Sequence, residues 1–170
     1  MPRILTTPRL YLRRFTEADT ALVLALNSRP EVTQYLHEQL LQTEADALRI
    51  IQQHLLPQYA HNLGRWAVFL NDTHQFIGWC GLKYRPELDE IDLGYRFLPE
   101  QWGKGYATEA AQYTLQYALQ ELRLKTVTAR AHIENTASLK VLEKIGMQYL
   151  KDEVVDDCPV KTFVAVNADV

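Results

Sequence analysis

The stretch from Gly94 to Ala110 holds the most chemically informative residues of the sequence. It combines an expected strand end, a turn at Pro99, a loop of small residues at 103–105 and the start of a helix. Glycines let a ligand approach the backbone closely, and the first N–H groups of a helix attract an anion. Lys104 adds a positive charge beside them. The pattern predicts a binding site for a phosphate-bearing ligand, with a diphosphate as the natural candidate.

The Gly103-Lys104-Gly105 loop also fits a simpler explanation, a tight turn whose glycines serve only the backbone geometry. Two other phosphate-binding loops do not fit. A Rossmann loop needs a third glycine and an earlier place in the chain, and a P-loop needs Lys-Ser or Lys-Thr after its last glycine. The loop alone therefore leaves a turn and an anion site as alternatives.

Composition places the chain among ordinary globular proteins and excludes several function classes. Of its 170 residues 47% are hydrophobic and 23% charged, and the formal net charge is −3. A mildly acidic chain offers no broad basic face for nucleic acid. No apolar run approaches the roughly 20 residues that span a bilayer, and the start lacks the apolar region of a secretory signal. We expect a cytoplasmic protein without a nucleic-acid or membrane partner.

The two cysteines do not suggest a disulfide scaffold or a thiol enzyme. Cys80 lies in an apolar stretch, and Cys158 precedes a proline in an acidic segment. Reduced thiols in the cytosol are the simpler interpretation. Neither cysteine has an evident activating base nearby in the sequence, and we expect no catalytic cysteine and no metal.

The first third of the chain is predicted to be rich in helix. Leu10 to Phe15 alternates apolar residues with arginine and predicts a strand. Thr16 and Thr43 each begin a capping pattern with an aspartate three residues later. Helices are expected over 16–27, 30–36 and 43–56, and Pro57 is expected to stop the last of them.

From Gly64 the pattern changes to strands with a few helices. Strands are expected at 66–70, 76–80, 88–97, 126–131, 148–155 and 161–166, and helices at 106–122 and 135–145. Gly146 stands at the expected C′ position of the last helix. The order is an antiparallel meander, one β-α-β crossover, then a helix and a hairpin. We predict a single α/β (α+β) domain over residues 1–170, with a mixed, mostly antiparallel central sheet, flanking helices and one parallel strand pair.

The sequence resembles the GNAT superfamily of N-acetyltransferases in two internal motifs and at its start. The run from Gly94 to Ala110 is similar to the cofactor loop, and Asn135 to Met147 is similar to the helix that follows the crossover. The opening Thr7-Pro8-Arg9-Leu10-Tyr11-Leu12-Arg13 resembles the branch that includes the ribosomal-protein-alanine N-acetyltransferases. The resemblance spans nearly the whole chain. It implies the GNAT fold, with its parallel strands splayed at the cofactor site, and direct transfer of acetyl from acetyl-coenzyme A to a primary amine in a ternary complex.

One position departs from the family pattern. The superfamily loop reads Gln/Arg-x-x-Gly-x-Gly/Ala, and with Gly105 and Ala107 as its last members Trp102 stands where Gln or Arg is expected. The branch that this chain resembles tolerates an aromatic residue there. The change removes a polar side chain from the diphosphate site and leaves more of the binding to backbone N–H groups.

The resemblance assigns most of the site to the cofactor. Acetyl-coenzyme A would enter where the strands ending near Phe97 and Ala131 separate, because their unpaired backbone groups need partners. The backbone N–H of Phe97 or Leu98 would stabilise the thioester oxyanion, although both side chains also suit an ordinary core. The cofactor-binding residues implied in this way are Phe97, Leu98, Trp102, Gly103, Lys104, Gly105, Tyr106, Ala107, Thr108, Asn135 and Ser138.

Asn135 and Ser138 each have two interpretations. Asn135 suits the N-cap of the last helix, and the resemblance adds a contact with the pantetheine arm. Ser138 lies in the first turn of that helix, where a polar residue needs no function. The resemblance implies that its hydroxyl protonates the departing thiolate.

A primary amine must lose its proton before it attacks, so a base or a water chain is expected. Glu90 and Asp92 share one face of an expected strand, and His132 and Glu134 end the neighbouring one. Asp92 precedes Phe97 by five residues, roughly 16 Å along a strand, which favours a water relay over direct transfer. All four are candidates, and each also fits a structural or surface role.

The acceptor side is less defined. Family resemblance places residues 27–43 along the acceptor groove, where Tyr35, Leu36 and His37 could contact a peptide N-terminus or a small amine. The acidic segment 152–157 could face a basic acceptor, although a solvated hairpin is the simpler interpretation. A non-catalytic coenzyme A-binding module is the alternative function, and a nucleotide-phosphate binder is a third. The acceptor's identity and the oligomeric state, with a homodimer among the options, stay open.

Overall fold

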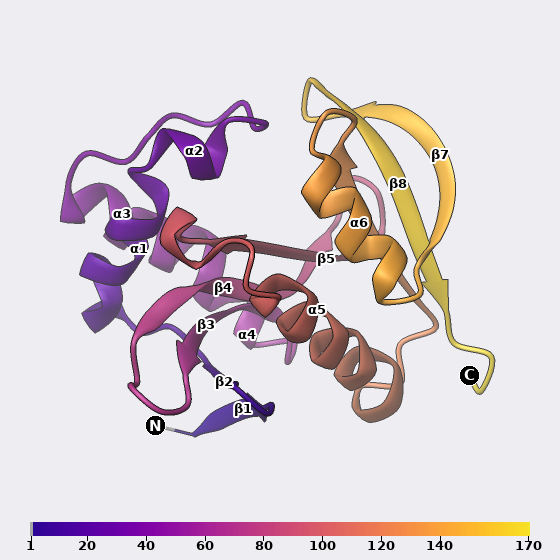
Figure 1. Cartoon of the computed structure of the whole chain (residues 1–170), viewed down its shortest axis with the longest axis horizontal. Coiled ribbons are helices and arrows are strands. Elements are labelled where there is room, and N and C mark those ends of the chain that lie inside the picture. Colours follow the sequence, from indigo (N-terminus) through magenta and orange to yellow (C-terminus); the bar gives the residue numbers. More distant parts are fainter. Residues whose placement is uncertain (1) are drawn as a thin grey trace.

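The computed structural model describes residues 2–170. Its centre is an eight-stranded sheet in the order β1-β2-β3-β4-β5-β6-β8-β7, with helices on both faces (Figure 1). The strands are β1 (Arg3–Thr6), β2 (Leu10–Arg13), β3 (Gly64–Leu70), β4 (Phe76–Arg85), β5 (Glu90–Phe97), β6 (Thr126–His132), β7 (Gln148–Val155) and β8 (Cys158–Val166). β5 and β6 pair in parallel, and the other six strand pairs of residues 2–170 are antiparallel. The predicted mixed, mostly antiparallel sheet is confirmed.

The helices agree with the predicted order but differ in detail. They are η1 (Glu17–Asp19), α1 (Thr20–Asn27), α2 (Pro30–Thr33), α3 (Glu44–Ile50), η2 (Ile51–Leu55), α4 (Leu56–Tyr59), η3 (Pro99–Gln101), α5 (Tyr106–Gln116), η4 (Tyr117–Glu121) and α6 (Thr136–Lys144). Both predicted capping boxes, at Thr16 and Thr43, are present. The expectation that Pro57 stops its helix was wrong. A wider π-type turn precedes the proline, which then stands in the first turn of α4, where its missing N–H removes no helical bond.

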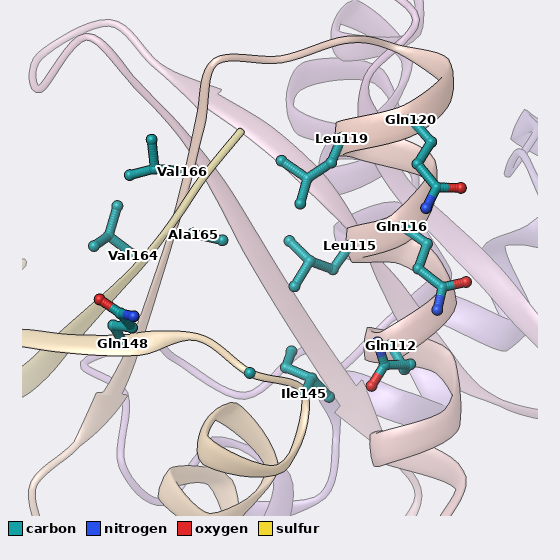
Figure 2. A pocket seen from close by; sticks show the side chains of 11 residues that line it. Gln112, Leu115, Gln116, Leu119, Gln120, Ile145, Gln148, Val164, Ala165 and Val166 are labelled. Carbon is teal, nitrogen blue, oxygen red and sulfur yellow. The ribbon is translucent and has the colours of Figure 1, made fainter. Parts of the chain in front are cut away.

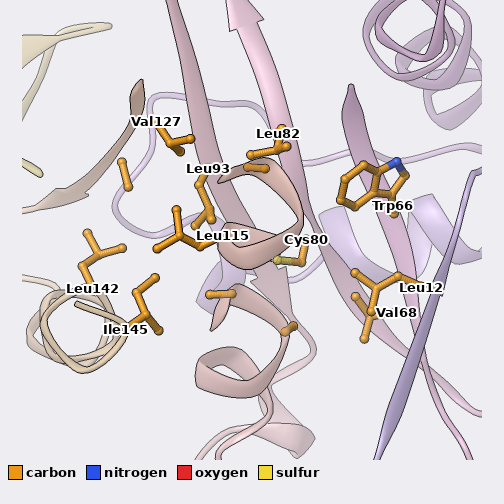
Figure 3. Packing of buried hydrophobic residues seen from close by; sticks show 14 of the residues in the cluster. Leu12, Trp66, Val68, Cys80, Leu82, Leu93, Leu115, Val127, Leu142 and Ile145 are labelled. Atoms are coloured by element: carbon orange, nitrogen blue, oxygen red, sulfur yellow. The ribbon is translucent and has the colours of Figure 1, made fainter. Parts of the chain in front are cut away.

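Two apolar layers hold the sheet, one on each face. Strand alternation in β3 sends Trp66 and Val68 to one layer and Ala67 and Phe69 to the other. In the first layer, Leu115 of α5 and Leu142 of α6 pack on the strands, together with Ile145 just after α6 (Figure 3). The second layer joins the sheet to α1, α3 and η2. A sheet covered on both faces explains why residues 66–70 and 76–80 are apolar without alternation.

The parallel pair is short, and this positions the site. β5 and β6 pair only at Asp92–Thr128 and Leu93–Ala129, although β5 continues to Phe97 and β6 to His132. Beyond Leu93 the two strands have separated, while β4 and β8 still pair with their outer edges. The crossover helix α5 begins beside this opening (Figure 1). The splayed strand pair expected from the family resemblance is therefore present.

Candidate active site

A cleft of about 1330 Å³ opens where β5 and β6 separate. Its lining includes most of the predicted site residues: Asp92, Phe97, Trp102, Gly103, Gly105, Tyr106, Ala107, Thr108, His132, Asn135 and Ser138. Leu98, Lys104 and Glu90 are not among the residues that line it. The cleft also reaches Tyr35, Leu36 and His37, so the predicted cofactor and acceptor regions share one opening.

The N-terminus of α5 presents unpaired backbone N–H groups at the cleft. Gly105 is its N-cap in a left-handed conformation, with φ +82 and no side chain capping the helix. The first helical hydrogen bond runs from the Glu109 N–H to the Gly105 carbonyl, at 3.1 Å. The N–H groups of Tyr106, Ala107 and Thr108 therefore have no partner within the helix, and these residues line the cleft. They form a concentrated donor group at the positive end of the helix dipole.

The loop before α5 is held by the start of the chain. The Arg9 guanidinium donates to the Lys104 carbonyl at 2.8 Å and pairs with the Glu109 carboxylate at 2.7 Å. The Thr7 hydroxyl donates to the same carboxylate at 2.5 Å. Burial alone would raise the pKa of Glu109, but these hydrogen bonds from Thr7 and Arg9 hold it below its ordinary value. The Lys104 ammonium donates to the Gln101 side-chain oxygen at 3.4 Å, and Lys104 is not among the residues that line the cleft.

The end of β5 shows which backbone donor is free to face the cleft. The Leu98 N–H donates to the Ile77 carbonyl at 2.9 Å and is therefore not free to bind an oxyanion. Because antiparallel ladders alternate, the N–H of Phe97 points away from β4, toward the opening. Trp102 has a role that the sequence did not indicate, since its indole N–H donates to the Phe97 carbonyl at 2.8 Å. The residue that replaces Gln or Arg in the loop thus tethers the strand end.

The first turn of α6 brings Asn135 and Ser138 to the cleft. The Asn135 side-chain oxygen accepts from the Ser138 N–H at 3.2 Å, which confirms the predicted N-cap. The Asn135 amide N–H groups remain for other partners. The Ser138 hydroxyl lies 2.7 Å from the Tyr95 hydroxyl, a partner that the sequence analysis missed. Burial raises the pKa of Tyr95 to about 12, against the smaller opposing effect of the Ser138 hydrogen bond.

Two predicted base candidates are engaged in ion pairs. The Asp92 carboxylate is buried 3.6 Å from the Arg65 guanidinium and 3.8 Å from that of Arg85. The Glu90 carboxylate lies 2.6 Å from the guanidinium of Arg130. Either group could accept a proton only by giving up a partly buried ion pair.

His132 has its ring oriented by the backbone. Its Nδ1 accepts from the Glu134 N–H at 3.1 Å, so the neutral ring carries its proton on Nε2. The remaining ring nitrogen is then a donor. The ring packs against Tyr35, with centroids 5.1 Å apart. With Nε2 as a donor, the His132 ring suits a hydrogen bond to the amine substrate better than removal of a proton from that amine.

Ion pairs join residues 27–38, which belong to the segment expected along the acceptor groove, to β5. Arg96 donates to the Asn27 side chain at 2.6 Å and pairs with Glu38 at 2.6 Å. Arg29 pairs with Glu100, just beyond β5, at 2.6 Å. These contacts hold residues 27–38 at one side of the cleft.

The acidic segment 152–157 is largely occupied by contacts within the protein. Asp152 pairs with Lys161 at 3.0 Å, and Asp156 pairs with Arg85 at 2.6 Å. Glu153 lies 3.4 Å from Arg130. Asp156 is the acidic residue of this segment that lines the cleft.

A second hollow, of about 340 Å³, lies between α5 and β8. Figure 2 shows Leu115 and Leu119 directed toward the strand that carries Ala165, whereas Gln116 and Gln120 point outward. The residues that line it include no ionisable side chain. It therefore offers no groups for acid-base chemistry or for binding a diphosphate.

Both thiols are buried and free, and neither has the setting of a nucleophile. Burial raises the pKa of Cys80 to about 11, so this thiol is protonated at neutral pH. Cys158 lies 3.6 Å from the Tyr35 carbonyl. Across residues 2–170 no group of three or more His, Cys, Asp or Glu side chains is arranged to hold a metal ion. The same residues include no helix that combines the length and apolarity needed to cross a bilayer.

The splayed strand pair, the uncapped helix N-terminus beside it and the surrounding mixed sheet define an acetyltransferase of the GNAT type. Residues 9–148 match the acetyltransferase (GNAT) domain family, and the chain belongs to this family. The uncharacterized N-acetyltransferase YnaD of Bacillus subtilis (strain 168) is 34% identical over 145 residues, which cover 85% of this chain and 82% of YnaD. The protein is thus an acyltransferase.

Solved structures show the same fold. A GNAT-family acetyltransferase from Bacillus anthracis aligns with a TM-score of 0.79 at 28% identity, over 96% of this chain and 98% of that one. The ribosomal α-N-protein acetyltransferase RimL, in complex with coenzyme A, aligns with a TM-score of 0.82 at 15% identity, over 97% and 98%.

Proposed function

We propose that this chain transfers an acetyl group from acetyl-coenzyme A to a primary amine, by direct attack in a ternary complex. One observation carries the proposal. The donor groups at the start of α5, the separated edge of β5 and the acceptor-side residues around Tyr35 all line one cleft. A thioester held at the strand opening and an amine entering past Tyr35 would meet there without a covalent enzyme intermediate.

The chain's backbone would bind and activate the thioester. The unpaired N–H groups of Tyr106, Ala107 and Thr108 would hold the diphosphate, and the free edge of β5 would pair with the pantetheine amides. The Phe97 N–H would donate to the thioester oxygen as negative charge develops on it. Loss of one such donor costs on the order of 10²- to 10³-fold in rate in other acyl-transfer enzymes.

Ser138 is the group that we assign to the leaving sulfur. The amine nitrogen forms a C–N bond, the C–S bond breaks, and the Ser138 hydroxyl donates to the thiolate as it departs. The proton lost from nitrogen passes to water, and water returns a proton to Ser138, so the proton lost from nitrogen balances the proton gained by sulfur. Of the three candidate carboxylates, Glu134 is the one that lines the cleft and takes part in no ion pair within residues 2–170. We therefore assign proton removal to water that can reach Glu134, ahead of Asp92, Glu90 and His132.

The charges of the cleft favour an acceptor with one amine over a polyamine. Glu38, Asp92 and Asp156 all line the cleft, but each is paired with arginine. A polycation would therefore find few free carboxylates to bind. We infer that the acceptor is a protein N-terminus or a small monoamine.

The test is an acceptor panel with acetyl-coenzyme A, read by release of free thiol and by the mass of the product. The panel contains peptides with free and blocked N-termini, a simple monoamine and spermidine. We expect release with the free peptide or the monoamine and none with the blocked peptide. Coenzyme A binding without release for any amine would show a non-catalytic binding module, and displacement of coenzyme A by ATP would show a nucleotide-phosphate binder.

We further infer one acetyltransferase domain that acts in the cytoplasm. The continuous eight-stranded sheet supports a single domain, and two buried free thiols suit a reducing compartment. Leu150 and Val154 are exposed on the edge strand β7, which supports a homodimer. Sedimentation of the wild type beside Val154→Lys would test this. A monomer at micromolar concentration would contradict the dimer.

A further inference from the structure

Tyr95 and Ser138 are joined across the opening that separates β5 from α6. Their hydroxyl oxygens lie 2.7 Å apart, although the residues are 43 positions apart in sequence. Tyr95 stands two residues before Phe97, and the two rings pack with centroids 5.9 Å apart. Both Tyr95 and Ser138 line the cleft. The Tyr95 hydroxyl therefore reaches the serine that we assign to the leaving sulfur, from the strand whose free edge borders the cleft.

A serine hydroxyl needs a partner if its proton is to point in one direction. The hydroxyl rotates freely about its C–O bond, and in a helix it can also turn back to a carbonyl of the preceding turn. The Asn135 cap holds the Ser138 backbone but leaves its hydroxyl unconstrained. A phenol is the stronger acid of the two, so the favourable arrangement has the Tyr95 hydroxyl donating to Ser138 Oγ. The Ser138 proton is then left for a third atom.

We propose that Tyr95 is a positioning residue, which holds Ser138 Oγ as an acceptor and so directs the Ser138 proton to the sulfur of coenzyme A. This inference rests on the proposed function, because delivery of the Ser138 proton to sulfur matters only if the chain transfers acetyl from coenzyme A. Tyr95 need not give up its own proton, and the bonds broken and formed in the transfer are unchanged. Because burial raises the pKa of Tyr95 to about 12, the phenol stays a donor throughout the pH range of an enzyme assay.

The first test needs no acceptor amine. Ultraviolet absorbance follows the thiolate of bound coenzyme A as pH rises, with about 8.5 as the ordinary thiol pKa. A directed Ser138 donor stabilises the thiolate, so the wild type should lower the apparent pKa of the bound thiol. Tyr95→Phe and Ser138→Ala should both return it toward the value of free coenzyme A.

A matched control separates this effect from the loss of any buried phenol. Tyr59 is also buried but is not among the residues that line the cleft. Its hydroxyl donates to the Arg65 carbonyl at 2.6 Å. Tyr59→Phe should lower stability but leave the thiol pKa at the wild-type value. If Tyr95→Phe also leaves the bound thiol pKa unchanged, the positioning role is overturned.

The second test is kinetic. Tyr95→Phe should lower kcat by about 3- to 10-fold, the size expected for one hydrogen bond, with the Kd for coenzyme A unchanged. In a Ser138→Ala background the same change should cost nothing further, because the oriented group is already gone. Losses that multiply in the double variant would overturn the inference.

The outcomes distinguish this inference from the proposed function. If the wild type transfers acetyl but Tyr95→Phe behaves as the wild type in both tests, the function stands and the positioning fails. If the bound thiol responds to Tyr95 but no amine is acetylated, the positioning stands and the proposed transfer fails. If coenzyme A does not bind, both fail.

Discussion

Replacing Gly105 with alanine should weaken cofactor binding in addition to costing the fold some stability. A Cβ at Gly105 would lie 3.2 Å from the Arg9 guanidinium, at a backbone φ of +82. The left-handed conformation costs a non-glycine residue roughly 1–2 kcal/mol, so the Tm should fall by about 2–8 °C. Displacing Arg9 would also break its hydrogen bond to the Lys104 carbonyl. The N–H groups of residues 106–108 would then no longer point in a common direction. We expect the Kd for coenzyme A to rise about 10-fold, which is about 1.4 kcal/mol.

Gly146→Ala is the matched control. Gly146 follows α6 with φ +90, and a Cβ there would meet no atom within 4 Å. It therefore carries similar backbone strain without a contact to the cofactor loop. At a coenzyme A concentration of 100 times the wild-type Kd, ligand binding should stabilise the wild type and Gly146→Ala by about 2.7 kcal/mol. The same concentration should stabilise Gly105→Ala by only about 1.4 kcal/mol.

The assay is thermal unfolding with and without coenzyme A, beside direct titration calorimetry. Wild-type affinity in Gly105→Ala would show that the loop is a turn without a binding role. An equal loss of affinity in Gly146→Ala would show that backbone strain, and not the loop geometry, weakens binding.

Three further predictions concern single side chains. Ser138→Ala should lower kcat about 10- to 100-fold in steady-state kinetics with little change in cofactor Kd, and an unchanged kcat would remove its role as acid. Asn135→Ala should cost about 1 kcal/mol of unfolding free energy and raise the cofactor Kd, whereas Asn135→Ser should keep the cap and show only the change in Kd. The lowered pKa of Glu109 means that its stabilising contribution is present above about pH 4.5 and is lost as pH falls through the lower folded-state value. Urea unfolding should therefore show wild type more stable than Glu109→Gln at pH 7, with the difference shrinking in acid; a constant difference would contradict this.

Local features of the fold could be predicted because they depend on neighbours along the chain. The Thr16 and Thr43 capping boxes and the Asn135 cap each involve residues two or three positions apart. The strand β1 was missed, since it is partly exposed and owes its form to pairing with β2. Pro57 was misread because the π-type turn before it changes the position of the proline within the helix.

By itself the sequence determined the order of the strands from β2 onward, the helix start at 105–106 and its donor groups, because backbone geometry and capping are set within a few residues. Only the tertiary structure decided which groups the site can use. Arg9 reaches Glu109 across 100 residues, and Tyr95 reaches Ser138 across 43. The same packing engages the Leu98 N–H with the Ile77 carbonyl and leaves the Phe97 N–H directed to the opening, which is why we propose Phe97 as the oxyanion donor. These partners meet because the sheet brings distant strands and helices together, and hydrogen bonds formed at that stage leave no periodic signal in the sequence.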